Sequence, residues 1–301
     1  MNDNQYLQNI LDAQTLDPDG EEIKALRAHR KDVEALLSGK FKDSALTIRY
    51  GGSKAKGTMI VEAYDLDLIA YFDHDDTSAG DTLKDIYFNV ETALASDYLI
   101  VRKPSALRLK SKDANQYGVD FHIDVVPGRY VDDTQGDTFL YQSTGDKERL
   151  KTNLDVHITH VKDSGVIDAI RLLKLWRVRN ALPIKHFALE LLAIELLKDK
   201  RNKALSDQLT HVWTELRDNL DAISIEDPAN PTGNDLSELL NDGVRSSISA
   251  VAKSTLTLIA DFGWEKVFGP VEETESESKA SGLRRAAAVV TTPSKPWSRP
   301  K

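Results

Sequence analysis

The sequence predicts an α+β fold in which a small mixed sheet is followed by an α-helical region. Up to about residue 150, short β-rich runs such as LDLIAYF (66–72) alternate with helical segments. From there to residue 270, apolar residues recur at helical spacing, as in GVIDAIRLLKLWRVRN (165–180). The remaining stretch, 271–301, is rich in charged and small residues and proline, which is typical of a flexible tail. We therefore divide the chain into residues 1–150, 151–270 and 271–301.

Composition excludes several classes of function. The chain has 301 residues, a net charge of −9 and no cysteine, which excludes disulfides, thiolate zinc sites and cysteine nucleophiles. It has no apolar run near the roughly 20 residues of a membrane span, and its N-terminus lacks a signal-peptide pattern. We expect a cytoplasmic protein without a membrane partner. The acidic balance argues against nucleic acid as the main partner, because phosphate contacts need a basic surface.

The elements of the first half follow from local patterns. A helix is expected over residues 17–37, where Asp17-Pro18 supplies a cap and a first-turn proline. A second helix is expected over 82–96. Strands are expected at SALTIRY (44–50), LDLIAYF (66–72), YLIVRK (98–103), ALRLK (106–110) and VDFHIDVV (119–126), and Pro127-Gly128 is expected to close the last of them.

Four apolar segments make the second half helical. The helices are expected at GVIDAIRLLKLWRVRN (165–180), HFALELLAIELLKDK (186–200), LSDQLTHVWTELRDNLDAI (205–223) and VRSSISAVAKSTLTLIADFG (244–263). EDPANPTGND (226–235), with two prolines, is typical of a loop.

GGSKAKGT (51–58) has the glycine spacing of a phosphate-binding loop. In the Walker motif a lysine directly follows the second glycine, but Thr58 follows Gly57 here, so that motif is excluded. The glycines still allow backbone N–H groups to approach an anion closely.

Carboxylates downstream of this loop indicate a metal site. Side chains alternate along a strand, so Asp65 and Asp67 share one face, and Asp120, His122 and Asp124 form a second set of the same kind. Adjacent carboxylates repel each other unless a cation lies between them, and Mg²⁺ takes carboxylate and phosphate oxygens. If the two strands are neighbours, a third carboxylate can complete a two-metal site for in-line displacement.

GGS, the following GT, DLDL and HIDVVP occur in the order seen in one superfamily. The chain resembles nucleotidyltransferases of the polymerase-β type, which implies a polymerase-β-like nucleotidyltransferase core. More narrowly, IRLLKLW, IKHFALELL, EDPANPTGN and WEKVFG resemble the bacterial cyclic-oligonucleotide synthases (CD-NTases), relatives of cyclic GMP-AMP synthase and oligoadenylate synthetase. The resemblance covers roughly residues 20–270.

The resemblance assigns the three aspartates to metal binding and catalysis. Asp65 and Asp67 would bind two Mg²⁺ ions, with Mn²⁺ as an alternative ion. Asp124 would share the ion that activates the attacking ribose hydroxyl.

The same resemblance assigns four residues to the nucleotide. Gly52 and Ser53 would hold the β- and γ-phosphates, and Lys174 would contact the triphosphate, although a Lys there can also simply extend to solvent. His186 stands where the family commonly has Ser, and an imidazole can also donate a hydrogen bond to phosphate.

Other ionisable residues receive plainer interpretations. We expect Glu190 and Glu195 to be paired structural acids or to lie on a solvent-facing edge. His157 and His160 are three residues apart, but without Cys or an HExxH motif a zinc site is disfavoured. His122 is expected to support the site or the core rather than to bind metal.

The implied function is template-independent conversion of NTPs, ATP and GTP foremost, to a cyclic di- or oligonucleotide, with an antiphage signalling role. Whether an activator protein is a further partner stays open, as do the bases, ring size and linkage. One alternative is transfer to a macromolecule, as in tRNA tailing or protein nucleotidylation, and the acidic balance argues against tRNA. Another is an inactive nucleotide-binding scaffold, against which the intact aspartates argue.

Overall fold

The computed structural model describes residues 1–112, 123–145, 147–234 and 236–271. Within them, seven strands form one sheet in the order β1-β2-β5-β4-β3, and β6 and β7 extend it from β5. β2 and β5 are parallel, whereas every other described strand pair is antiparallel. The strands are β1 (Leu46–Tyr50), β2 (Leu66–Phe72), β3 (Tyr98–Arg102), β4 (Leu107–Ser111), β5 (Ile123–Tyr130), β6 (Thr138–Tyr141) and β7 (Arg149–Thr152).

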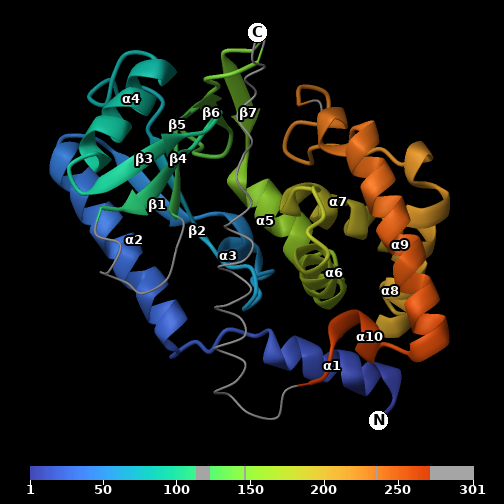
Figure 1. Ribbon diagram of the computed structural model, residues 1–301. Coiled ribbons are helices and arrows are strands. Elements are labelled where there is room, and N and C mark those ends of the chain that lie inside the picture. The colour runs from blue at the N-terminus through green and yellow to red at the C-terminus, as the bar shows by residue number, and fades with distance from the viewer. Residues whose placement is uncertain (113–122, 146, 235, 272–301) are drawn as a thin grey trace, which may run out of the picture.

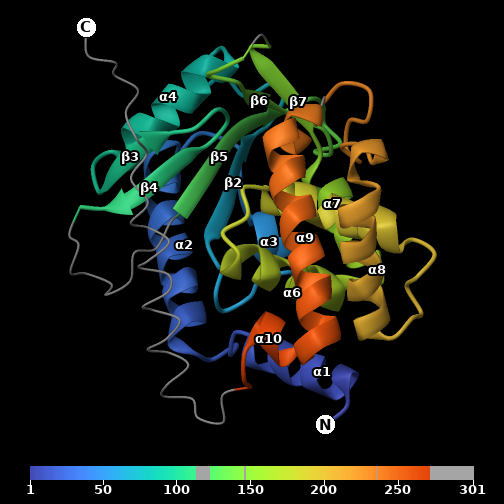
Figure 2. The ribbon, with the colours of Figure 1, turned by 45° about the vertical axis from the view of Figure 1, so that its right-hand side comes forward.

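Two helices cover one face of the sheet. α2 (Glu21–Lys40) and α4 (Leu83–Leu94) lie on the side away from the helical half (Figures 1 and 2). Alternate residues of β2 enter the apolar core beneath them: Leu66, Leu68, Ala70 and Phe72. The intervening positions, including Asp67, therefore point to the opposite face, toward the helical half.

The helical half has its own apolar core, built around Trp176, Trp213 and Trp264. α1 (Asp3–Ala13) packs against α6 (Ile167–Arg179) and α8 (Leu205–Asp218). The Tyr6 hydroxyl donates to the Gly269 carbonyl at 2.5 Å, so the two ends of the described chain lie side by side (Figure 1). None of the described helices has the length and apolar character that a bilayer span requires. The helices are α1 (Asp3–Ala13), α5 (Leu154–Lys162), α6 (Ile167–Arg179), α7 (His186–Leu197), α8 (Leu205–Asp218), α9 (Asp242–Phe262) and α10 (Glu265–Phe268), with 3₁₀ turns η1 (Leu220–Ala222) and η2 (Ser237–Leu240).

The predicted α+β class is confirmed, but the expected start of one helix is wrong. The helix expected over 17–37 is α2, which begins at Glu21, not Asp17, because the Asp17 carbonyl accepts from Gly20 N and its carboxylate from Asp19 N, which together form a turn. Val271, the first residue of the segment that we expect to be a flexible tail, packs against the helical core. Residues 272–301 lie outside the described chain.

β5 does not end at Pro127-Gly128, contrary to our expectation, but continues to Tyr130. Pairing with β4 stops at Val125 and pairing with β6 starts at Gly128, so no antiparallel partner needs the N–H that Pro127 lacks. At Gly128 a Cβ atom would lie 2.7 Å from a Leu140 side-chain atom, so only glycine lets β6 approach this closely.

Candidate active site

The structure brings the three predicted aspartates together at one end of β2 and β5. The two strands are neighbours, and Asp67 pairs directly with Asp124 across the parallel ladder. Asp65 immediately precedes β2, two positions before Asp67, and so shares its face. Asp120 and His122, which we placed in the same set as Asp124, lie outside the described residues.

Mutual repulsion and burial set the charge state of this cluster. Burial, with Asp65 and Asp124 nearby, raises the pKa of Asp67 to about 7. Burial also raises the pKa of Asp65, although Lys174 opposes the shift. Two carboxyl groups with raised pKa values, side by side, are what an unneutralised cation site produces.

Asp124 differs because it has two cationic partners that the sequence analysis did not identify. Arg108 donates from Nε to Oδ1 and from Nη2 to Oδ2, both at 2.8 Å, and Lys103 Nζ donates to Oδ2 at 2.7 Å. Burial alone would raise the pKa of Asp124, but the hydrogen bonds from Arg108 and Lys103 hold it below the usual value.

The glycine-rich segment forms a short helix, α3 (Gly52–Lys56), against the aspartates. Gly51 N donates to the Asp67 carbonyl at 2.8 Å. Gly52 adopts φ +50, and a Cβ atom there would lie 1.6 Å from Asp67 Oδ2. Ser53 is buried beside it. The glycine is therefore required both for the backbone turn and for contact with the carboxylate.

A buried ionic cluster joins this segment to the helical half. Glu190 on α7 accepts from Lys56 Nζ at 2.5 Å and from Thr58 Oγ1 at 2.7 Å. Lys174 Nζ on α6 donates to the Thr58 carbonyl at 2.8 Å and lies 3.7 Å from Glu190 Oε1. Burial lowers the pKa of Lys174, and Glu190 partly offsets that effect. Lys56 and Lys174 share the carboxylate of Glu190, and Lys174 also lies near Asp65 and Asp67.

His186 begins α7 next to this cluster. Its Nε2 lies 3.2 Å from Arg177 Nη1, and because a guanidinium only donates, Nε2 accepts and Nδ1 carries the proton. Burial, with Lys174 and Arg177 nearby, lowers the pKa of His186 to about 3, so the ring is neutral at physiological pH. Nδ1 is buried and has no hydrogen-bond partner within the described residues.

Glu190, Glu195 and His157 have structural partners. Glu190 is a paired buried acid and Glu195 pairs with Lys198 in solvent, as we expected of both. His157 Nε2 lies 2.6 Å from Asp227 Oδ1, and the second oxygen of Asp227 accepts from Asn234 Nδ2.

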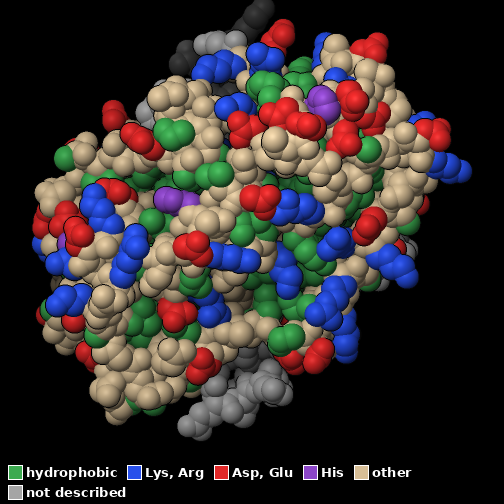
Figure 3. All heavy atoms as spheres, turned by 180° about the vertical axis from the view of Figure 1, so that it is seen from behind, with side chains coloured by type: hydrophobic (Ala, Val, Ile, Leu, Met, Phe, Trp, Pro, Cys, Tyr) green, Lys and Arg blue, Asp and Glu red, His purple; other side chains and the backbone are tan. Residues whose placement is uncertain are grey.

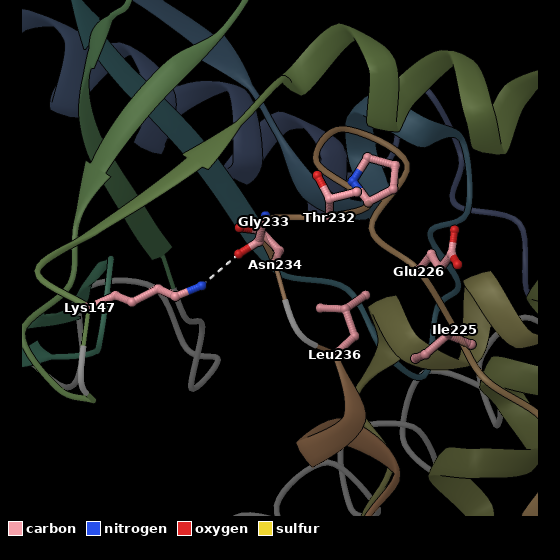
Figure 4. A pocket seen from close by; sticks show the side chains of 8 residues that line it. Lys147, Ile225, Glu226, Thr232, Gly233, Asn234 and Leu236 are labelled. Carbon is pink, nitrogen blue, oxygen red and sulfur yellow. Dashed lines mark hydrogen bonds between the residues drawn. The ribbon is translucent and has the colours of Figure 1, made fainter.

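A cavity of about 310 Å³ lies apart from the aspartates, where the turn between β6 and β7 meets loop 225–236. Lys147 Nζ reaches across and donates to the Gly233 carbonyl at 2.7 Å (Figure 4). None of the predicted site residues lines this cavity. The residues that line it are Lys147, Ile225, Glu226, Pro231, Thr232, Gly233, Asn234 and Leu236. We regard this contact as a tether between the sheet and the helical half.

The donor set of the aspartate cluster fits Mg²⁺, which prefers carboxylate and phosphate oxygens. Asp65 and Asp67 have raised pKa values that a cation would relieve. Among the described residues, however, no group of three or more His, Cys, Asp or Glu side chains is arranged so that it could hold a metal ion. The oxygens of Asp124 are occupied by Lys103 and Arg108 instead.

No model of a known protein family matches this chain, and no curated protein sequence does either. Solved structures do match. CdnC of E. coli MS115-1 with ATP has a TM-score of 0.65 and 20% identity, covering 91% of this chain and 99% of that one. CdnC has also been solved in a complex with HORMA-deltaN. The CD-NTase CdnG of Bradyrhizobium diazoefficiens with GTP has a TM-score of 0.66 and 14% identity, covering 96% and 98%.

This chain has the CD-NTase fold. The resemblance inferred from its motifs is thus confirmed at the level of the fold. The chain is also similar in fold to the Cid1 poly(U) polymerase, whose MgATP-bound mutant structure has a TM-score of 0.62 and 12% identity, covering 88% of this chain and 98% of that one.

Proposed function

We propose that this protein is a template-independent nucleotidyltransferase that converts NTPs to a cyclic di- or oligonucleotide and releases pyrophosphate. The observation that carries the proposal is the pairing of Asp67 with Asp124 on adjacent parallel strands, with Gly52 packed against Asp67. A scaffold without catalytic function would not need Asp67 and Asp124 to be held next to each other on adjacent strands, with Asp65 two positions before Asp67.

In the proposed reaction, the oxygen of a ribose hydroxyl attacks the α-phosphorus of an NTP, and the hydroxyl proton is lost to solvent. The bond from that phosphorus to the bridging oxygen breaks, and pyrophosphate leaves with the electron pair. Asp65, Asp67 and Asp124 would hold two Mg²⁺ ions, which supply positive charge to the attacking and leaving oxygens. A second transfer within the linear product closes the ring.

The triphosphate has a defined place in this scheme. Lys56 and Lys174 share the single charge of Glu190, so the corner beside α3 can neutralise phosphate. The Nδ1–H of neutral His186 has no partner among the described residues, and the backbone at Gly52 and Ser53 supplies further N–H groups. We propose that these residues bind the triphosphate and orient its α-phosphorus.

Transfer to a macromolecule is the competing proposal, because Cid1 has a related fold. The net charge of −9 opposes an extended RNA site. Side chains of both signs are interspersed on the face seen in Figure 3, which also gives no support to a basic RNA track there. We therefore favour free NTPs as the substrates.

The biological role and the partners of the protein are inferred from the same resemblance and are part of the proposal. We infer an antiphage signalling role in the cytoplasm. An activator protein is a reasonable further partner, since CdnC is known with HORMA-deltaN bound. ATP and GTP are the first substrates to test.

Product identification tests the proposal. The purified protein is incubated with Mg²⁺ and all four NTPs, with no macromolecule, and products are separated and weighed by mass spectrometry after phosphatase treatment. A cyclic oligonucleotide survives the phosphatase and supports the proposal. A parallel reaction uses labelled NTPs with added RNA or protein. Label that is transferred to the RNA or protein, with no cyclic product formed in its absence, would support macromolecular transfer and contradict the proposal.

A further inference from the structure

Arg108 and Lys103 both donate hydrogen bonds to the carboxylate of Asp124. Arg108 is the register partner of Asp124 on β4, so the two side chains lie next to each other on one face. Its guanidinium contacts both carboxylate oxygens, an arrangement that fixes the carboxylate orientation as well as its charge.

Lys103 reaches Asp124 from a fixed turn. Lys103 N donates to the Ala106 carbonyl at 2.8 Å. The buried Tyr87 hydroxyl lies 2.9 and 3.0 Å from the carbonyl oxygens of Lys103 and Ala106. Ser143 Oγ also donates to the Lys103 carbonyl, at 3.2 Å. The turn aims the ammonium group at Asp124.

The three aspartates are therefore neutralised unequally. Among the described residues, Asp124 alone of the three has direct ion-pair partners, and these two cations offset two of the three negative charges. The Asp124 side chain is 12% exposed, whereas those of Arg108 and Lys103 are 26% and 33% exposed. The cations lie on the solvent side of the carboxylate, where an incoming anion can reach them.

We propose that Arg108 and Lys103 are positioning residues that act as internal counter-ions of Asp124 and couple divalent-ion binding to nucleotide binding. The hydrogen bonds from Arg108 and Lys103 use three of the roughly four lone-pair sites of the Asp124 carboxylate, so a divalent ion that takes more than the remaining site must displace at least one of the two cations. A displaced cation needs another anion, and the phosphates of an arriving nucleotide provide one. Without nucleotide, the ion meets a site that is already largely neutralised and binds weakly. This inference rests on the proposed function.

The test uses Mn²⁺ alone as the probe, because its free form gives an electron paramagnetic resonance signal that disappears on binding. Mn²⁺ is titrated into the full chain with and without a non-hydrolysable ATP analogue. Arg108→Gln should tighten Mn²⁺ binding without nucleotide by about tenfold or more, the size of one charged hydrogen bond. Lys103→Gln should also tighten Mn²⁺ binding, and it provides an independent test if Arg108→Gln does not fold.

Two further variants distinguish the specific effect of Arg108 on Mn²⁺ binding from the effect of removing any positive charge on β4. Arg108→Lys keeps the charge but loses the contact to both oxygens, so its Mn²⁺ affinity should lie between those of the parent and Arg108→Gln. Lys110→Gln removes an exposed charge from the same strand, and it should change the Mn²⁺ affinity less than about twofold because solvent screens it.

The outcomes are distinct. Tighter nucleotide-free Mn²⁺ binding in Arg108→Gln and Lys103→Gln, with a smaller enhancement by the analogue, supports the inference. Unchanged or weaker binding in both variants overturns it while leaving the proposed function intact. If the parent protein binds no Mn²⁺ even with the analogue, both the inference and the proposed function are overturned.

Discussion

The backbone of Gly52 rests against the carboxylate of Asp67, and a Cβ atom on residue 52 would lie 1.6 Å from Asp67 Oδ2. This contact joins the phosphate-binding segment to the metal-binding strand. A side chain at residue 52 would have to push the carboxylate away or move the turn.

Gly52→Ala should therefore reduce turnover by at least about 100-fold, the cost of a misplacement of about 1 Å in a site of this kind. The matched control is Gly57→Ala. Gly57 also has positive φ, +77, but a Cβ atom on residue 57 would meet no neighbouring atom within 4 Å, so this variant should lose stability without a comparable loss of turnover. Equal turnover losses in the two variants would show that backbone strain, not contact with Asp67, is responsible.

The shared carboxylate of Glu190 leads to a stability prediction. Glu190→Gln leaves Lys56 and Lys174 buried without their counter-charge, and should lower the free energy of unfolding by about 3 kcal/mol. Urea unfolding measures this. Glu195→Gln is the control, because Glu195 is 52% exposed and pairs with Lys198 in solvent; its effect should stay within about 0.5 kcal/mol. A Glu190 variant as stable as the Glu195 variant would refute the buried cluster.

His186 leads to a prediction about pH. Burial, together with the nearby Lys174 and Arg177, lowers its pKa from the ordinary histidine value of 6.5 to about 3. Between these pH values the unfolded chain binds one more proton than the folded chain, so stability falls as pH drops below about 6.5. The titration of His186 alone should lower the free energy of unfolding by about 2 kcal/mol between pH 7 and pH 5.

Urea unfolding at pH 7 and pH 5 tests this with His186→Gln, which should show a correspondingly smaller loss on acidification. His74→Gln, which removes an imidazole that is 40% exposed, controls for the loss of a histidine. The same loss on acidification in the parent and His186→Gln would contradict the assignment.

Local patterns predicted the elements that position the aspartates. The apolar run at 66–72 coincides with β2, and Thr82, at the start of the helix expected over 82–96, caps α4 through a reciprocal pair with Asp85. α1 was not predicted, although its buried residues Tyr6, Leu7, Ile10 and Leu11 recur at helical spacing. β6 and β7 were not predicted either: β6 (TFLY) is rich in strand-favouring residues but only four residues long, and β7 (RLKT) lacks an apolar run.

The partners within the site depend on tertiary structure that sequence patterns do not encode. Arg108 meets Asp124 only because β4 pairs with β5 in one particular register. Lys56 and Glu190 are 134 residues apart and come from opposite halves of the fold. Strand alternation could place Asp65 and Asp67 on one face, but it could not say which cations face them.

The most direct test of the central claim is pyrophosphate release by Asp65→Asn/Asp67→Asn with Mg²⁺ and all four NTPs. The change is nearly isosteric and removes two ligand charges, so the rate should fall about 1,000-fold or more while the melting curve shows a folded protein. Asp75→Asn, whose side chain is 80% exposed beyond the other end of β2, should keep the parent rate. A double variant that releases pyrophosphate at the parent rate would place the chemistry elsewhere and contradict the account.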